Sequence, residues 1–101
     1  PIARGVELYG AQIRQGALYS QRLHDRNTVV AHLSLDHNER AMELLATMPK
    51  DAVTEYLRAI ACSRLGRKAE GREHFLEACR LDGRMEYRGN LDPEIAELLK
   101  Q

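Results

Sequence analysis

The side chains best suited to metal or covalent chemistry in this sequence are four histidines and two cysteines. Two metal ligands on one helix need a spacing of three or four residues to share a face. The sequence places His32 and His37 five residues apart, and His74 and Cys79 likewise. We therefore expect no metal site, and we interpret these histidines and His24 as solvated or packed side chains.

The two cysteines, Cys62 and Cys79, occupy positions expected to face the interior of a helix pair, which favours packing over nucleophilic catalysis. If the chain turns back at Gly66, Cys62 lies four residues before the turn and Cys79 thirteen after it. This offset of nine residues corresponds to about 13 Å along a helix. A disulfide needs Cα atoms within about 7 Å, so we expect free thiols.

The acidic residues form no catalytic arrangement. Glu70, Glu73 and Glu77 follow each other at intervals of three and four residues beside basic residues, which is typical of a salt-bridged helix surface. The seven glycines are scattered, so the sequence has no glycine-rich phosphate-binding loop. We expect neither an enzyme nor a cofactor.

Basic side chains gather at and after Gly66, namely Arg64, Arg67, Lys68, Arg72, Arg80, Arg84 and Arg88. Because arginine binds phosphate in a bidentate manner, an anion or nucleic-acid patch is one interpretation. A solvated turn, neutralised by the neighbouring glutamates, is the interpretation that we favour. The whole chain has 15 basic and 15 acidic residues and a pI of about 7.4, so we expect no nucleic-acid partner.

The helices that would position these residues are clearest between Asp51 and Asp82. Asp51 is a predicted N-cap, since its carboxylate suits the free amides of a first helical turn. The apolar stripe that follows has helical spacing and consists of Val53, Tyr56, Leu57 and Ile60. The opposite face is expected to carry Glu55, Arg58 and Ser63.

A second helix is predicted from about Lys68 to Leu81, after a left-handed turn at Gly66. Its inner face is expected to contain Gly71, Phe75 and Ala78. Gly71 costs about 1 kcal/mol of helix propensity relative to alanine. We therefore predict that another backbone passes close to it.

These positions resemble the tetratricopeptide repeat, a family of helical hairpins that stack side by side. The matching residues are Ala59 and Gly71 at the two small positions, Phe75 at the aromatic, Ala78 at the next small position, and Leu81-Asp82-Gly83 at the closing Leu-Asp-Pro. Arg58 departs from the usual leucine, Gly83 from the usual proline, and no tryptophan stands near the start. The order also looks like the repeat region of cell-envelope proteins from anaerobic Gram-negative bacteria.

The preceding residues predict a first hairpin over 27–49, after degenerate leading helices over 1–24. We expect a break at 25–27, a short helix from Thr28 to Leu35, and a helix from Glu39 to Met48. Asp36 and Glu39 have the spacing of a capping box.

After Asp82, the sequence GRMEYRGN is expected to be an irregular connector. Asp92 and Pro93 are a clear helix start. Ile95, Leu98 and Leu99 would give the helix over 92–101 one apolar face. This helix is expected to cap the stack.

We thus expect a single all-α domain over 1–101, built from antiparallel helix pairs in a short right-handed superhelix. In the resembled family, the first helices of successive repeats line a concave groove that binds protein or peptide. Carried over by position, that groove would include Arg26, Val30, Leu33, Val53, Tyr56, Ile60, Ser63 and Arg64. Plain core packing is the alternative for Tyr56 and Ile60.

The expected function is therefore a non-catalytic binding scaffold, and a structural spacer or end-cap is the alternative. Pro1 is not an initiator methionine, which favours a piece of a longer protein. The apolar runs are short, so we expect no membrane insertion by this segment. The compartment is undetermined, with the cell envelope or periplasm and the cytoplasm both open.

Overall fold

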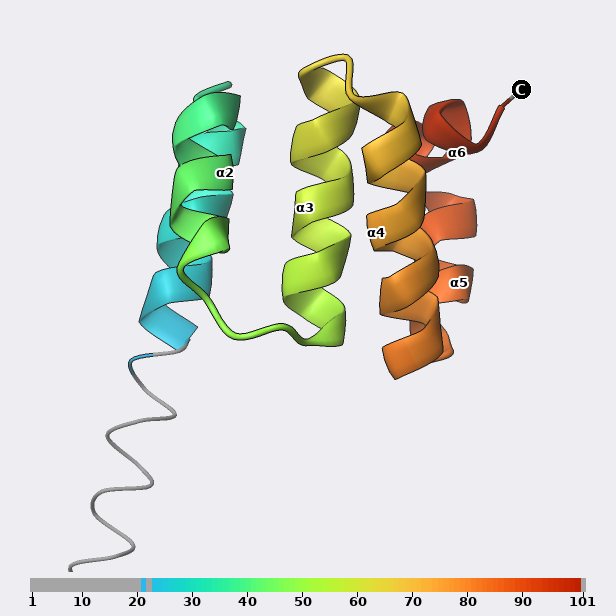
Figure 1. Ribbon diagram of the computed structural model, residues 1–101, viewed down its shortest axis with the longest axis horizontal. Coiled ribbons are helices and arrows are strands. Elements are labelled where there is room, and N and C mark those ends of the chain that lie inside the picture. The colour runs from blue at the N-terminus through green and yellow to red at the C-terminus, as the bar shows by residue number, and fades with distance from the viewer. Residues whose placement is uncertain (1–20, 22, 101) are drawn as a thin grey trace, which may run out of the picture.

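The computed structural model describes residues 21 and 23–100, and these residues form six helices. The first covers residues 23–34. It is followed by α2 (Asn38–Ala46), α3 (Ala52–Arg64), α4 (Lys68–Leu81), α5 (Arg84–Leu91) and α6 (Pro93–Leu99). Most helices pack against their neighbours in sequence, as Figure 1 shows, and α6 also reaches back to α3. The all-α prediction is confirmed, whereas the leading segment before residue 21 lies outside the described residues.

The hairpin of α3 and α4 forms as its sequence predicts. The Asp51 carboxylate accepts a hydrogen bond from the Thr54 amide at 2.8 Å, and the Thr54 hydroxyl accepts one from the Asp51 amide at 2.9 Å. Gly66 has a φ of +79°, the left-handed conformation that glycine adopts without strain. A Cβ atom on Gly71 would lie 3.2 Å from the Ala59 carbonyl oxygen, which confirms a close backbone approach.

Helix α3 separates two hydrophobic cores. Towards the N-terminus, Leu57 and Ala61 pack against helix 23–34 and α2, together with Val29, Leu33, Ala41 and Leu45. Towards the C-terminus, Tyr56 and Ala59 pack against the later helices, together with Phe75, Ala78, Met85, Ile95 and Leu98. Successive residues of one helix therefore serve different cores, which makes α3 the central element of the fold.

The segment predicted as an irregular connector is instead the helix α5, so that prediction is wrong. Met85 and Gly89 lie one turn apart on its buried face. A Cβ atom on Gly89 would overlap the Phe75 ring, so the glycine lets α5 lie close against that side chain. The helix is stabilised by this packing, which outweighs the low helix propensity of a sequence with Gly and Asn.

The last helix begins as predicted, with Asp92 accepting a hydrogen bond from the Glu94 amide at 3.0 Å and Pro93 in the first helical turn. Ile95 and Leu98 are buried, while Leu99 remains 39 % exposed. The predicted apolar face is thus narrower than expected.

Two predictions about the first hairpin are wrong. Residues 25–27 do not break the helix, which continues through them from residue 23 to 34. Asp36 is not an N-cap: it has a φ of +59° in the turn, and His37 precedes α2 without a side-chain cap. Thr28, where the short helix was predicted to begin, lies inside the longer helix and donates its hydroxyl to the His24 carbonyl.

None of the helices among the described residues combines the length and apolarity needed to span a membrane.

Candidate functional site

The eight residues predicted to line a groove lie on two helices. Arg26, Val30 and Leu33 belong to helix 23–34, and the other five belong to α3. Val30 is 45 % exposed, and Arg26 is half-buried. On α3, the half-buried members are Val53, Ile60 and Ser63. Each of the two helices therefore keeps some accessible side chains from the predicted groove, with buried residues between them.

Tyr56 lies in the core, as the alternative interpretation of this residue proposed. Its side chain is fully buried, and its ring meets the Phe75 ring edge to face with centroids 6.1 Å apart. The Tyr56 hydroxyl donates to Asp92 Oδ2 at 2.7 Å, and the Arg88 guanidinium lies 4.4 Å from the ring centroid. Burial, and then the hydrogen bond to the Asp92 carboxylate, raise the pKa of Tyr56 well above its ordinary value of 10.0. Leu33, which is 6 % exposed, is also a core residue.

Arg64 connects α3 to three other helices at one end of the molecule. Its Nη1 donates to the Leu33 carbonyl at 2.5 Å and to Asn38 Oδ1 at 3.3 Å. Its Nη2 lies 2.9 Å from Glu94 Oε1 in α6. The side chain keeps 27 % exposure, so most of its hydrogen-bonding capacity is used within the fold.

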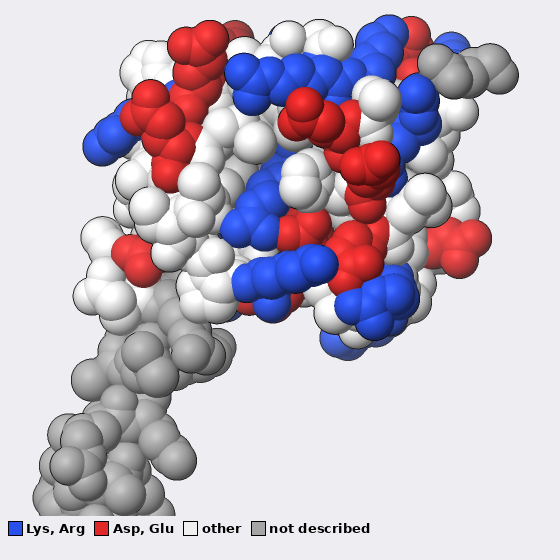
Figure 2. Space-filling model, viewed as in Figure 1, with Lys and Arg blue, Asp and Glu red and all other residues white. Residues whose placement is uncertain are grey.

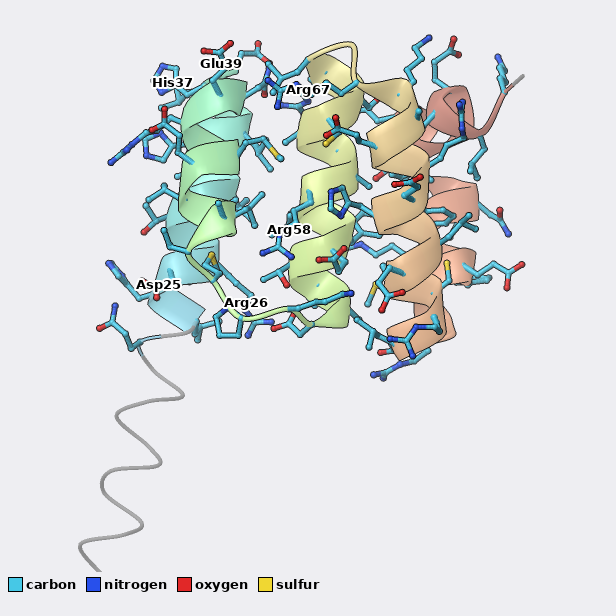
Figure 3. All side chains as sticks on the ribbon, viewed as in Figure 1. Asp25, Arg26, His37, Glu39, Arg58 and Arg67 are labelled. Atoms are coloured by element: carbon cyan, nitrogen blue, oxygen red, sulfur yellow. The ribbon has the colours of Figure 1, made fainter. Side chains whose placement is uncertain are left out.

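A buried polar cluster, which sequence reasoning missed, joins the first hairpin to the second. Glu55 is only 2 % exposed, although its position in the sequence predicted the polar face. Its carboxylate pairs with Arg58 through Oε1 and with His74 Nδ1 through Oε2 at 2.7 Å. Arg58 also donates to the carbonyls of Leu45 at 2.6 Å and Met48 at 3.2 Å. Figure 3 shows Arg58 between α2 and α3.

The placement of Arg58 and Glu55 explains why the sequence pattern was misleading. Arg58 stands where the tetratricopeptide repeat, which the sequence resembles, usually has leucine. Its guanidinium donates hydrogen bonds to carbonyls at the C-terminal end of α2. Glu55, one turn before it, supplies the counter-charge that a buried guanidinium needs. Two features of the sequence could have revealed this cluster. Glu55 and Arg58 have opposite charges and lie three residues apart on one helix, and Arg58 stands where the resembled repeat usually has leucine.

Much of the basic patch after Gly66 is engaged within the fold. Arg64 and Arg88 make the contacts described above, and Arg72 Nη1 donates to the Leu98 carbonyl at 3.4 Å. Arg84 binds Asp82 at 2.8 Å. Hydrogen bonds from Arg80, with a further contribution from Lys50, lower the pKa of Glu77 to about 2. Figure 2 shows acidic and basic side chains interspersed on the visible face, which weakens the case for an anion site.

The cysteines are free thiols, and their environments differ. Cys62 is fully buried and Cys79 half-buried. Burial raises the pKa of both thiols, and the charges of Glu70 and Glu86 respectively add to that effect. Neither environment activates a thiol for nucleophilic attack, since the reactive form is the thiolate.

Two histidines that seemed too far apart in sequence come together. His32 Nδ1 lies 3.4 Å from His37 Nδ1, with ring centroids 5.6 Å apart. No group of three or more histidine, cysteine or carboxylate side chains gathers as a metal site in the described part of the chain.

Three shallow hollows open on the surface, and none includes a predicted groove residue. One of about 290 Å³ is lined by Gln21, His24, Asp25, Thr28, Leu44, Thr47 and Met48. At the other end of α2, two hollows of about 270 and 340 Å³ share Glu39 and Leu65. Figure 3 places Asp25 at one end of this hairpin and His37 with Glu39 at the other.

No protein-family model, curated protein or solved structure matches this chain.

Proposed function

We propose that this chain is a helical-repeat module of tetratricopeptide type that binds a protein or peptide and catalyses no reaction. Support comes from the α3–α4 hairpin, where Ala59 and Gly71 are in close contact and Phe75 packs in the core below them. In a right-handed stack of this kind, helix 23–34 and α3 would be the first helices of two successive hairpins. Their shared surface would then be the concave face, closed at one end by α6.

The observation that carries the proposal is the accessibility left on these two helices. Val30 is 45 % exposed, Val53 and Ile60 are half-buried, and the polar residues Arg26 and Ser63 on the same two helices are also half-buried. Apolar side chains bordered by hydrogen-bonding groups suit an extended or helical peptide. Such a surface could gain binding energy without a rearrangement of the fold.

A spacer or end-cap without a ligand is the second candidate, and a specific observation favours it. Tyr56 and Arg64 are the types of residue that most often anchor an interface. Both already make contacts within the molecule. Tyr56 binds Asp92, and Arg64 binds the Leu33 carbonyl and Glu94. Binding would therefore depend on the weaker contacts of Val30 and its neighbours.

Selection of peptides from a random display library against the full chain tests the proposal. Selected peptides should bind Val30→Glu at least about tenfold more weakly, a loss of about 1.4 kcal/mol. The matched control is Leu76→Glu, which changes a leucine on α4 that is 62 % exposed and outside the two helices. Failure to select any specific peptide, or equal binding by Val30→Glu and the wild type, would favour the spacer.

A further inference from the structure

The turn between helix 23–34 and α2 brings two imidazoles together, and we propose that they bind a divalent transition-metal ion such as Zn²⁺. The Nδ1 atoms of His32 and His37 are 3.4 Å apart. Two nitrogens that bind one tetrahedral zinc ion at about 2.0 to 2.1 Å are separated by about 3.3 Å. The two rings are thus already spaced as neighbouring ligands.

The backbone of the turn holds this spacing. The His37 amide donates to the His32 carbonyl at 2.8 Å, and the Asp36 amide donates to the Leu33 carbonyl at 3.1 Å. Asp36 reverses the chain through its left-handed conformation, with a φ of +59°. Because the chain turns between the histidines, the spacing rule for two ligands on one helix does not apply to them.

Without a metal ion, the two Nδ1 atoms are within hydrogen-bonding distance, and such a bond requires one of them to carry a proton. The 3.4 Å separation of the two Nδ1 atoms exceeds the usual N–H donor distance of about 2.7 to 3.2 Å. In neutral histidines with their protons on Nε2, both Nδ1 atoms carry lone pairs and neither can donate. Only in this tautomer can a metal ion accept both lone pairs at once.

Carboxylates and guanidinium groups both lie near the pair. His37 lines a hollow of about 340 Å³ that also contains the carboxylates of Asp36 and Glu39, and Figure 3 shows His37 and Glu39 at the same end of α2. Two arginines lie close to these carboxylates: Arg40 borders the hollow with its guanidinium 3.0 Å from Glu43, and Arg64 Nη1 lies 3.5 Å from Asp36 Oδ1. Because Asp36 is paired with Arg64, Glu39 contributes more of the net negative charge.

The site is open to solvent. Among the residues described, no third histidine, cysteine or carboxylate joins the two imidazoles as a ligand. Water would therefore occupy the remaining coordination positions. Bound metal would link the end of helix 23–34 to the start of α2 and would stabilise this hairpin.

Calorimetric titration of the full chain with ZnCl₂ at about pH 7.5, where imidazole is neutral, tests the proposal. We expect one ion per chain and an affinity at least about tenfold lower in His32→Gln and in His37→Gln, because each loses a ligand. The control is His24→Gln, an exposed histidine on the same helix, which should bind zinc as the wild type does. Circular dichroism checks that each variant is folded.

Thermal unfolding gives an independent readout, since a ligand of the folded state raises the melting temperature. Zinc should raise the melting temperature of the wild type and of His24→Gln, but not that of His37→Gln. The shift should disappear at about pH 5, where protonated imidazoles release the metal. Absence of zinc binding by the wild type, or unchanged binding by both His32→Gln and His37→Gln, would overturn the proposal.

Discussion

Burial of the Glu55 carboxylate is tolerated because the fold supplies a partner for each of its oxygens. Arg58 pairs with Oε1 and His74 with Oε2. Removing a charge from water costs several kcal/mol, and mutual attraction offsets that cost only while the partners remain in place. The cluster is therefore sensitive to the loss of any single member.

Replacing Arg58 with methionine should destabilise the protein by about 3 to 5 kcal/mol, the usual cost of breaking a buried ion pair. The change supplies an apolar side chain of similar length, but it leaves Glu55 without its arginine and removes the side-chain donor to the Leu45 carbonyl. Urea unfolding measures the difference in the free energy of unfolding.

The matched control is Arg40→Met, because Arg40 forms an ion pair with Glu43 in which the side chains are 59 % and 66 % exposed. Exposed pairs contribute about 0 to 1 kcal/mol, so this variant should unfold close to the wild type. Equal effects of the two substitutions would show that Arg58 is not held in a buried cluster.

Gly71 is required by the close contact between α3 and α4. A Cβ atom there would lie 3.0 Å from Leu98 Cδ1 and 3.2 Å from the Ala59 carbonyl oxygen. Gly71→Leu should therefore cost about 1 to 3 kcal/mol or more through overpacking. Gly83→Ala is the control, because no atom lies within 4 Å of its added Cβ. Thermal melts in which both variants match the wild type would contradict the packing.

At the scale of elements, α6 is attached to α3 through Asp92. One oxygen of this carboxylate caps α6 by accepting the Glu94 amide, and the other accepts the Tyr56 hydroxyl. The same side chain thus starts one helix and fixes its position against another. The phenol must keep its proton to donate this hydrogen bond.

The contact between α3 and α6 should weaken at high pH. The pKa of Tyr56 is raised in the folded state above its ordinary value of 10.0. The stabilisation is therefore complete below the unfolded pKa of about 10 and is lost as the pH rises above it. Near pH 7, Tyr56→Phe should cost about 1.5 to 3 kcal/mol, because the hydrogen bond is made to a charged acceptor.

Urea midpoints of the wild type and Tyr56→Phe, measured from pH 7 to 11, check this dependence. The advantage of the wild type should shrink as the pH passes 10, while titration of the other groups affects both proteins alike. A difference that stays constant over this range would contradict a buried phenol bound to Asp92.

At the scale of the whole molecule, the two cores share α3, so the two hairpins are coupled through one helix. Leu57 and Ala61 serve one core, and Tyr56 and Ala59 serve the other. Cys62 follows on the same helix and is fully buried. Its exposure should require separation of α3 from its neighbours, which makes it a probe of large-scale opening.

In native buffer, Cys79 should react with a thiol reagent before Cys62, since Cys79 is half-buried and Cys62 fully buried. A Cys79→Ser variant isolates the slower thiol, whose labelling should speed up sharply with denaturant. Raised pKa values, caused first by burial, will slow both reactions at neutral pH. Rapid native labelling of the Cys79→Ser variant would mean that α3 is less tightly enclosed.

Local sequence determined the features whose causes lie within a few residues. The cap at Asp51 and the helix start at Asp92-Pro93 follow from backbone groups that nearby side chains satisfy, and the left-handed turn follows from the conformational freedom of Gly66. Gly71 was also predictable, because an unfavourable residue inside a helix implies a close neighbour. These signals were enough for the hairpin and for the all-α class.

Only the tertiary structure decided which polar residues are buried and which distant residues meet. Glu55 has a surface pattern in sequence, but it is buried because His74 on α4 pairs with it and because Arg58, its partner on α3, is held by the Leu45 carbonyl of α2. The segment before Asp92 becomes helical because Gly89 packs on Phe75, and Tyr56 is core because α6 covers it. His32 and His37 meet because the chain reverses at Asp36. Each outcome depends on contacts between separate elements, and the free energy of such contacts is not encoded in local spacing.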